Sequence, residues 1–313
     1  MIGLVVRRLF QLVLLLLGIS FLVFMSMFIA PGDPATIIGG PTASNSDLEA
    51  IRVDLGLDRP VLVQYFDYLG GILQGDFGYS YQTGQSVTEA ILTRFPNTIK
   101  LASASMAVAI IIGIIAGMIA AIKQNSWIDI SSTTFSLAGV SIPNFWLGTM
   151  LILIFAVNLQ WLPVGGLNSS IFTFQGVVEL ILPAITLGTA SAALIARMSR
   201  SAMLEVIKSD YIRTAKAKGV KRWSLIWIHA LRNAMIPVVT VIGINFGALL
   251  GGTIITEQVF AINGIGRLMI DAIAARDFPV VQGTVLLVAA IFVIVNLIVD
   301  IIYALIDPRI TYN

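Results

Sequence analysis

Six long apolar stretches run along this chain, and they restrict its fold more than any other feature. They occupy residues 9–30, 101–122, 130–157, 180–196, 235–256 and 280–299. A helix crosses the hydrocarbon core of a membrane with about 20 apolar residues. The chain is 57% hydrophobic and only 12% charged, whereas about 25% of a typical soluble domain is charged. The sequence therefore predicts an all-α integral membrane protein with six transmembrane helices.

Two of these stretches have features that affect their placement. The third is longer than a membrane requires and carries Pro143 near its middle, so a tilt or a kink is expected there. The first follows Arg7 and Arg8, as the apolar part of a secretory signal would. Its apolar run is too long for a signal peptide, and residues 28–30 lack the small-x-small cleavage pattern. We therefore expect a retained membrane anchor.

The distribution of basic residues predicts the orientation of the chain. With the N-terminus inside, the inner segments are 1–8, 123–129, 197–234 and 307–313, and they hold most of the 19 Lys and Arg residues. The loop at 158–179, on the other side, holds none. Because loops rich in Lys and Arg stay in the cytoplasm, both termini are expected to be cytoplasmic. The protein would then be a multi-pass protein of the inner (cytoplasmic) cell membrane.

This topology divides the chain into three regions. Residues 1–30 hold the N-terminus and the first transmembrane helix, and 31–97 form a small helical extracytoplasmic cap between helices 1 and 2. Residues 98–313 form the transmembrane core, which includes a large cytoplasmic loop at 197–234 between helices 4 and 5.

The cap is predicted to contain short helices joined by turns. Ser46 and Glu49 have the spacing of a capping box, with Gly56 as a stop. A second helix is expected over 61–73, starting after Pro60 and ending at one of the glycines near its end. Five aromatic residues either form a docking surface or pack the cap onto the helices, and both interpretations stay open: Tyr65, Phe66, Tyr68, Tyr79 and Tyr81.

The cytoplasmic loop holds the most informative pattern. Asp210 is a favourable N-cap and Gly219 a favourable stop, which predicts a helix of two turns over 211–218. On a helical wheel, one side of that helix holds Tyr211, Ile212, Ala215 and Gly219, and the other side holds Arg213 and Ala217. A second helix is predicted where apolar residues repeat at helical spacing: Trp223, Ile226, Trp227, Ala230 and Leu231.

A short helix with small residues on one side, followed by an aromatic helix, favours docking on a partner protein. The alternative is a basic amphipathic segment that lies on anionic lipid, because the loop is rich in Lys and Arg. The residue pattern by itself leaves both interpretations open.

Small residues at four-residue spacing occur in two of the apolar stretches. The second stretch has Gly113, Gly117 and Ala121, and the fifth has Gly243, Gly247 and Gly251 with Asn245 beside them. Such stripes allow two helices to approach closely. Packing within the chain is the simpler interpretation of both stripes. Contact with a partner subunit, or the lining of a pore, is the alternative for the fifth stretch.

Several kinds of chemistry have no residues to support them. The sequence has no cysteine, so a disulfide, a thiol nucleophile and a cysteine metal site are excluded. It has no P-loop pattern, so the chain is not expected to hydrolyse ATP by itself. Its sole histidine, His229, lies in the predicted amphipathic helix, where a structural role is expected. The six stretches have no ionisable residue in their interiors, and Glu257 and Asp300 lie at their ends. Because ion-coupled carriers place ionisable groups inside the membrane, a proton- or sodium-driven carrier is disfavoured.

The run DYIRTAKAKGVKRW…HALRNAMIPVVT, which ends at Thr240, resembles the cytoplasmic coupling motif of permeases from binding-protein-dependent ABC importers. Gly219 matches the glycine of the motif, and Pro237 matches its closing proline. Arg213 stands where the general motif has glutamate, and Thr214 replaces the first alanine. Both changes are usual in the peptide and nickel branch of that family.

Other segments resemble the same branch, so the resemblance covers nearly the whole chain. They include PGDPA at 31–35, LGLDRP at 55–60, QGDFGYS at 74–80 and the run at 257–283, in which Asn263 stands in place of an expected proline. Several ordered matches together are a more specific signal than any one of them.

The resemblance implies a permease subunit of an ATP-driven importer. Its partners would be a second homologous permease, two ATP-binding subunits, an extracytoplasmic solute-binding protein and membrane lipid, with no nucleic acid. ATP and Mg²⁺ would be bound by partner subunits, with no cofactor or metal on this chain. Di- and oligopeptides lead as substrates, with glutathione, nickel chelates and opine- or sugar-like solutes as alternatives. The residues that couple to the ATPase would be Asp210, Tyr211, Ile212, Arg213, Thr214, Ala215, Lys216, Ala217, Lys218 and Gly219.

Overall fold

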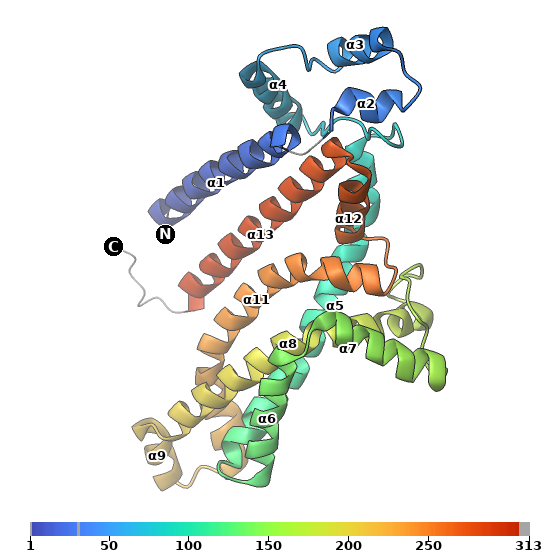
Figure 1. Ribbon diagram of the computed structural model, residues 1–313. Helices are drawn as coiled ribbons and strands as arrows, with labels where there is room; N and C mark the ends of the chain where they lie inside the picture. The colour runs from blue at the N-terminus through green and yellow to red at the C-terminus, as the bar shows by residue number, and fades with distance from the viewer. Residues whose placement is uncertain (1, 30–31, 307–313) are drawn as a thin grey trace. The chain divides into compact units, whose positions relative to one another are not determined.

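The computed structural model describes residues 2–29 and 32–306, and these are predominantly helical (Figure 1). The predicted all-α fold is confirmed for this part of the chain, where the one β-bridge pairs Tyr79 with Ser86. The elements, in which η marks a π-helix, are α1 (Ile2–Ile29), α2 (Pro34–Gly39), α3 (Asn45–Asp54), α4 (Val61–Leu73), α5 (Val87–Ile122), α6 (Trp127–Ser141), α7 (Asn144–Leu151), η1 (Ile152–Asn158), α8 (Phe174–Ile207), α9 (Asp210–Ala217), α10 (Arg222–Ser224), η2 (Leu225–Ala230), α11 (Leu231–Val259), α12 (Ile265–Ala275) and α13 (Phe278–Ile306).

The contacts within the chain divide it into two compact units. Unit 1 comprises Met1–Thr98 and Asn263–Val293, and unit 2 comprises Ile99–Ile262 and Ile294–Asn313. The three regions expected from the sequence are a different partition and stay a prediction. The predicted inner segment 307–313 lies outside the described residues.

Among the described residues, five helices are long and apolar enough to cross a membrane, and a bent pair of helices makes a sixth span if its two arms count as one. The five occupy Phe10–Ile29, Val87–Ile122, Phe174–Ile207, Leu225–Gly251 and Phe278–Val299. The bent pair joins Trp127–Ser141 to Asn144–Asn158 at an angle of 104°.

Proline explains why the third stretch breaks. We expected a tilt or a kink at Pro143, and the structure has a complete interruption there, visible between α6 and α7 in Figure 1. Pro143 has no backbone N–H to continue the helix, and its ring disfavours the helical conformation of the residue before it. Ile142 is accordingly extended, with φ −78° and ψ 123°. The chain restarts as a helix at Asn144.

Two helices are much longer than the apolar stretches that revealed them. α8 has 34 residues and includes the first residues of the predicted inner loop, and α5 has 36 residues and begins inside the predicted cap. Thr173 caps α8, because its side-chain oxygen accepts a hydrogen bond from the Gly176 backbone N–H. An apolar stretch reveals only the apolar part of a helix, so the polar turns at either end are missed.

The core of unit 2 is built around α8, whose fully buried side chains include Leu182, Leu187 and Ile195. α5 approaches α8 closely at the predicted glycine stripe. A Cβ atom added at Gly113 would lie 2.7 Å from Ile195 Cβ and 2.8 Å from the Ala192 carbonyl oxygen. Gly117 is closer still to the α8 backbone at residue 196. Intramolecular packing of this stripe is therefore confirmed.

In unit 1 both predicted cap helices form: α4 occupies 61–73 as predicted, whereas the cap of α3 differs. α3 is capped by a box in which Ser44 and Asp47 bond each other's backbone, rather than by Ser46 and Glu49. Glu49 instead accepts a hydrogen bond from Arg52 at 3.0 Å. The positive φ of +66° at Gly56 confirms the predicted stop. The predicted capping box of α3 lies two residues too far along the chain, because the segment contains two overlapping Ser-x-x-acid patterns.

Aromatic packing holds α4 against α1 within unit 1. The Tyr65 ring lies edge-on to Phe21 at a centroid distance of 5.3 Å, and its hydroxyl is 3.0 Å from the Ser20 hydroxyl. Of the five cap aromatics, Tyr65 is buried, whereas Phe66 and Tyr79 are 66% and 65% exposed. Packing thus explains part of the cluster, and the docking interpretation stays open for the exposed part.

Candidate coupling site

The two-turn helix predicted in the inner loop is present as α9, which follows the end of α8 (Figure 1). It begins one residue earlier than expected, because Ser209 occupies the N-cap position with φ −69° and ψ 153°. Asp210 is the first helical residue, and its carboxylate accepts a hydrogen bond from Arg213 Nη1 at 3.3 Å. Gly219 ends the helix as predicted, with φ +78°.

The side of α9 that faces the rest of unit 2 differs from our expectation. Ile212 is only 3% exposed and belongs to the hydrophobic core of unit 2, so it does not face a partner protein. Ala215 is half-buried on the same side. The exposed side carries Arg213, Thr214 and Ala217. The prediction was wrong about Ile212 because the one large aliphatic side chain of so short a helix is needed to anchor it.

A cavity of about 790 Å³ lies beneath α9. It is lined by the end of α5, the end of α8, α9 itself and η2, including Ile122, Leu204, Ile212, Lys216 and Ile226. The walls are mostly apolar and include the basic residues Lys208, Arg213 and Lys216. Four helical segments thus meet around this cavity.

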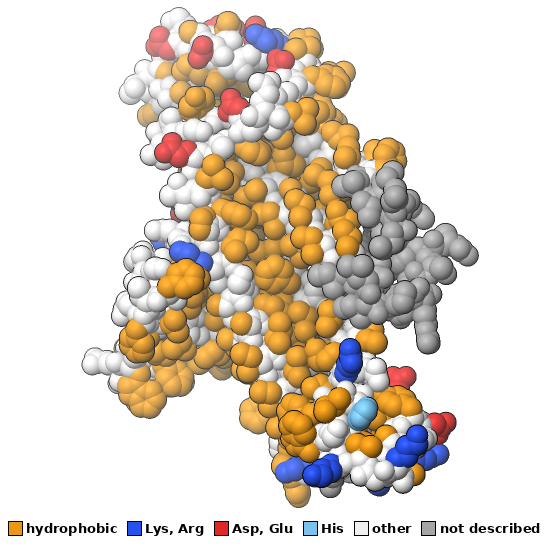
Figure 2. All heavy atoms as spheres, turned by 180° about the vertical axis from the view of Figure 1, so that it is seen from behind, with side chains coloured by type: hydrophobic (Ala, Val, Ile, Leu, Met, Phe, Trp, Pro, Cys, Tyr) orange, Lys and Arg blue, Asp and Glu red, His pale blue; other side chains and the backbone are white. Residues whose placement is uncertain are grey.

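Polar contacts tie α9 to the segment that leads into α11. Asn233 Nδ2 donates to the Tyr211 hydroxyl at 2.7 Å and also to the His229 carbonyl oxygen at 3.2 Å. His229 itself is exposed. Figure 2 shows basic side chains gathered over this end of unit 2, around the histidine.

The second predicted inner helix runs without interruption through α10 and η2 into α11. Trp223 and Trp227 stack on each other with ring centroids 6.0 Å apart and are 67% and 43% exposed. Ala230, on the other side, is fully buried. The spacing predicted one common apolar face, but the structure divides these residues between an exposed aromatic pair and a buried side, because the segment at Leu225–Ala230 is a π-helix.

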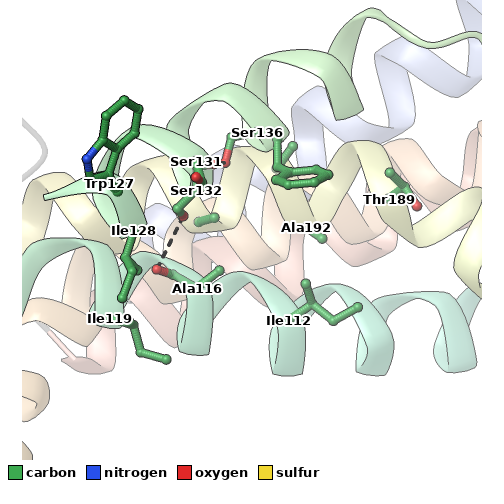
Figure 3. A pocket seen from close by; sticks show the side chains of 13 residues that line it. Ile112, Ala116, Ile119, Trp127, Ile128, Ser131, Ser132, Ser136, Thr189 and Ala192 are labelled. Carbon is green, nitrogen blue, oxygen red and sulfur yellow. Dashed lines mark hydrogen bonds between the residues drawn. The ribbon is translucent and has the colours of Figure 1, made fainter. Parts of the chain in front are cut away.

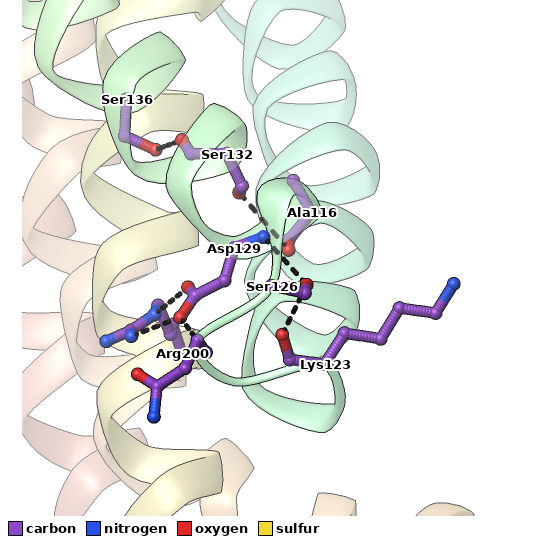
Figure 4. Close-up of polar contacts among 8 residues, drawn as sticks. Ala116, Lys123, Ser126, Asp129, Ser132, Ser136 and Arg200 are labelled. Carbon is purple, nitrogen blue, oxygen red and sulfur yellow. Dashed lines mark hydrogen bonds and ion pairs between the residues drawn. The ribbon is translucent and has the colours of Figure 1, made fainter.

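An ion pair that we did not predict braces α6 against α8 near this site (Figure 4). Arg200 donates two hydrogen bonds to the Asp129 carboxylate, Nε to Oδ1 at 2.5 Å and Nη2 to Oδ2 at 2.8 Å. Asp129 also accepts from the Asn125 backbone N–H at 2.9 Å and is 4% exposed. A bidentate arginine–carboxylate pair fixes both distance and orientation. The first turn of α6 is therefore held firmly on α8.

The glycine stripe of the fifth span does not act as one packing face. A Cβ at Gly243 would lie 2.6 Å from Val299 Cγ1 on α13, so this position packs within unit 2, and Gly247 is also buried. Gly251 is exposed, and a Cβ there would meet no atom within 4 Å. Asn245 Nδ2 donates to the Val241 carbonyl oxygen of its own helix at 2.8 Å. Contact with a partner subunit, or the lining of a pore, stays a prediction for the part of the stripe at Gly251.

A groove of about 600 Å³ runs along α6 where it faces α5 and α8 (Figure 3). Its walls are mainly aliphatic, with the hydroxyls of Ser131, Ser132 and Ser136 on the α6 side. Ser132 Oγ donates to the Ala116 carbonyl oxygen at 3.4 Å, which links α6 to α5. Such interhelical hydroxyl bonds are common where helices pack inside a membrane.

Comparison with known proteins assigns the family. Residues 110–312 match the family described as "Binding-protein-dependent transport system inner membrane component", and residues 1–102 match its N-terminal component. The chain belongs to this family. The resemblance stated from the sequence and the role of the chain as an importer permease are thereby confirmed.

Similar proteins extend over the full length of the chain. It is 45% identical over 313 residues to the glutathione transport system permease protein GsiC of Escherichia coli K12, covering 100% of both chains. It is 44% identical over 314 residues to a Brucella suis protein named "Putative peptide transport system permease protein", again covering 100% of both.

The solved structures of the MetNI methionine ABC transporter share the fold. One of its inward-facing forms superposes with a TM-score of 0.59 at 19% identity, over 69% of this chain and 96% of that chain. A second crystal form gives a TM-score of 0.57 at 18% identity. The fold is thus that of a membrane subunit of this class, and the chain is a multi-pass inner-membrane protein.

Proposed function

We propose that this permease imports small peptides, including glutathione-like peptides, in an ATP-driven complex. The observation that carries the substrate class is the full-length identity of 45% and 44% to permeases named for glutathione and for peptides. Nickel chelates and other small solutes are the alternatives that the sequence resemblance leaves.

In this proposal the chain works with a second homologous permease, two ATP-binding subunits and a solute-binding protein. The partner subunits bind ATP and Mg²⁺, in keeping with the absence of a P-loop pattern from this sequence. In this proposal both termini and α9 lie in the cytoplasm, which the distribution of Lys and Arg supports. A reporter fused after residue 313 should then be active only in the cytoplasm, and one fused near Ser44 only outside.

The exposed side of α9 makes the contact with an ATP-binding subunit. The buried Ile212 fixes the helix to unit 2, and the exposed side offers Arg213, Thr214 and Ala217 to a partner. Ala217 lets another backbone approach closely because its side chain is small. Arg213 adds a charge that suits an acidic groove on the partner.

Transport by the reconstituted complex tests the overall function. The chain is purified with its co-expressed partners, placed in liposomes with the solute-binding protein, and supplied with radiolabelled glutathione or dipeptide. Uptake is expected to require ATP and to survive collapse of the proton gradient. Gradient-driven uptake by this chain alone would contradict the proposal, as would an ATP-driven complex that transports nickel chelates and no peptide.

Cysteine crosslinking tests the role of α9. The sequence contains no cysteine, so Ala217→Cys introduces a single thiol on the exposed side and Ala215→Cys a matched thiol on the half-buried side. Paired with a cysteine in the groove of the ATP-binding subunit, Ala217→Cys should give the higher disulfide yield, since the bond needs Cα atoms roughly 4.4–6.8 Å apart. A helix that lies on lipid would label with membrane-phase reagents and give no crosslink.

A further inference from the structure

Unit 1 contains a second cavity, of about 670 Å³, that no feature of the coupling site explains. Its walls come from the end of α1, the loop after α3, one side of α4, the segment at 76–84 and the first turn of α13. Cavities that hold small-molecule ligands typically measure about 300–1,000 Å³. The cap cavity is therefore large enough for a ligand of a few amino acids.

The walls of the cap cavity are held together by hydrogen bonds. Asp277, which is 4% exposed and precedes α13, accepts from the Tyr81 backbone N–H at 3.0 Å and from the Ser80 hydroxyl. Gln82 Nε2 donates to the Ala275 carbonyl oxygen at 3.1 Å. The segment at 76–84 is thus fixed to the start of α13, and the cavity between them is a built feature of unit 1.

Two buried polar atoms in the lining of this cavity have no hydrogen-bond partner among the described residues. They are Gln282 Nε2, on a side chain that is 6% exposed, and the Tyr68 hydroxyl. Buried polar groups are almost always paired, so each exception calls for an explanation. Burial raises the pKa of Tyr68, so its hydroxyl keeps the proton and remains a donor. Both residues line the cavity, and each carries an unpaired donor of the kind that a carbonyl or carboxylate group accepts.

The more exposed part of the lining is mainly acidic, and its carboxylates accept hydrogen bonds rather than donate them. Asp54, Asp67 and Asp76 supply three carboxylates, and Arg59 supplies one guanidinium that pairs with Asp67 at 3.2 Å. The net charge there is negative and favours a cation. The exposed ring of Tyr79 also lines the cavity, and an aromatic face attracts an ammonium group.

We propose that the cap cavity binds a short peptide, with a carbonyl group at Gln282 and Tyr68 and its terminal ammonium group among the aspartates. A short peptide carries both groups and fits the volume. This inference rests on the proposed function, since it places a binding position for the transported class on the permease itself. The cavity then receives peptide on the outer side of the membrane before translocation.

Direct binding to the permease complex tests this assignment. The complex is purified without its solute-binding protein, and equilibrium binding of radiolabelled alanyl-phenylalanine is measured beside N-acetyl-alanyl-phenylalanine. The free-amine peptide should bind more tightly. Gln282→Leu and Tyr68→Phe should each weaken its binding roughly fivefold to tenfold, which is the usual effect of losing one hydrogen bond. Gln282→Glu removes the same donor with little change of shape and serves if the leucine variant fails to assemble.

A matched control and a second readout separate the possible outcomes. Gln85→Leu makes the same chemical change at an exposed cap residue that does not line the cavity, and should leave binding unchanged. ATP-driven uptake is measured on the same preparations. Normal uptake with no amine-dependent binding, or with binding unaffected by the Gln282 and Tyr68 variants, would overturn the cavity assignment and leave the transport function standing. Binding that follows these variants in a complex without peptide uptake would support the cavity and contradict the transport function.

Discussion

Replacing Gly117 with alanine tests the packing that positions α8. A methyl group at this position would lie 2.7 Å from Ser199 Cβ and 3.0 Å from the Arg200 backbone nitrogen, and closer still to the Ala196 carbonyl oxygen. Carbon atoms in ordinary contact are about 3.5–4.0 Å apart. Two of the three opposing atoms belong to the backbone of α8, so no side-chain rotation relieves the overlap. The two helices must move apart, or the variant must fold less stably.

The magnitude follows from two opposing effects. Overpacking of a well-filled core costs about 1–3 kcal/mol, and a backbone overlap of this size places Gly117→Ala in the upper part of that range. Alanine in place of glycine favours a helix by about 1 kcal/mol. The control is Gly251→Ala on α11, where the added methyl would meet no atom within 4 Å. Because the helix-propensity gain is common to both, the difference between the two variants isolates the clash, at about 2–3 kcal/mol.

Equilibrium unfolding in mixed micelles measures that difference. Both purified variants are titrated with denaturing detergent while tryptophan fluorescence is followed. Because all five tryptophans lie in unit 2, the fluorescence reports the unfolding of that unit. Gly117→Ala should unfold at a lower detergent fraction than the parent chain, and Gly251→Ala at an equal or higher one. Coincident midpoints for the two variants would show that α5 and α8 do not approach as described, and the account of the unit 2 core would fail.

Three further predictions follow: the first uses the same fluorescence titration, the second uses helix content by circular dichroism in the same titration, and the third uses transport. Asp129→Asn leaves Arg200 without its carboxylate and should destabilise the chain by about 2–3 kcal/mol. This is somewhat below the usual cost of breaking a fully buried pair, because the arginine side chain is 30% exposed. An unchanged stability would show that the pair does not brace α6. Tyr65→Phe should cost about 1 kcal/mol, whereas Tyr68→Phe should cost nothing without ligand, since only the first hydroxyl has a partner; equal effects would contradict this contrast. Gly219→Val should lose coupled transport, because valine is strained at the positive φ of this position. Gly219→Asn should retain most of the transport, because asparagine tolerates that conformation. Equal transport by the two variants would contradict the role of the left-handed stop.

The sequence predicts the membrane helices well because long apolar runs have few alternative explanations. It underestimates their ends, since the polar turns of α5 and α8 carry no hydropathy signal. The proline in the third stretch indicates where the chain bends, but a proline pattern does not determine an angle of 104°. That angle depends on how α6 and α7 each pack on α8, which is tertiary information.

The coupling site shows the same division between local and tertiary information. Gly219 and the length of α9 follow from local sequence, because a left-handed stop and a two-turn helix are local properties. The orientation of α9 does not, since grouping Ile212 with the small residues left open whether that side faces a partner or the core. The core contains Ile212 because an eight-residue helix has little else with which to anchor itself.

The sequence offers candidates for the ion pair between α6 and α8 but does not identify the pair. Asp129 and Arg200 both lie in segments assigned to the inner side of the membrane, and each is an ionisable residue next to an apolar stretch. Opposite charges at the same depth, close to apolar surroundings, favour pairing. Their exact partners still required the structure, because Lys123, Arg197 and Lys208 were equally available by sequence position.

Packing around α8 provides a physical route by which α9 would act on the membrane helices in the proposed cycle. The 34 residues of α8 extend about 50 Å at about 1.5 Å per residue, more than the roughly 30 Å thickness of the hydrocarbon core. α9 follows α8 directly and is fixed beside its end by Ile212, while Asp129 and Gly117 hold α6 and α5 to the same helix. Close-packed helices have little free volume and transmit displacement. In the proposed cycle, a partner that moves α9 would act on α8 through the chain connection and Ile212, and through α8 on α5 and α6.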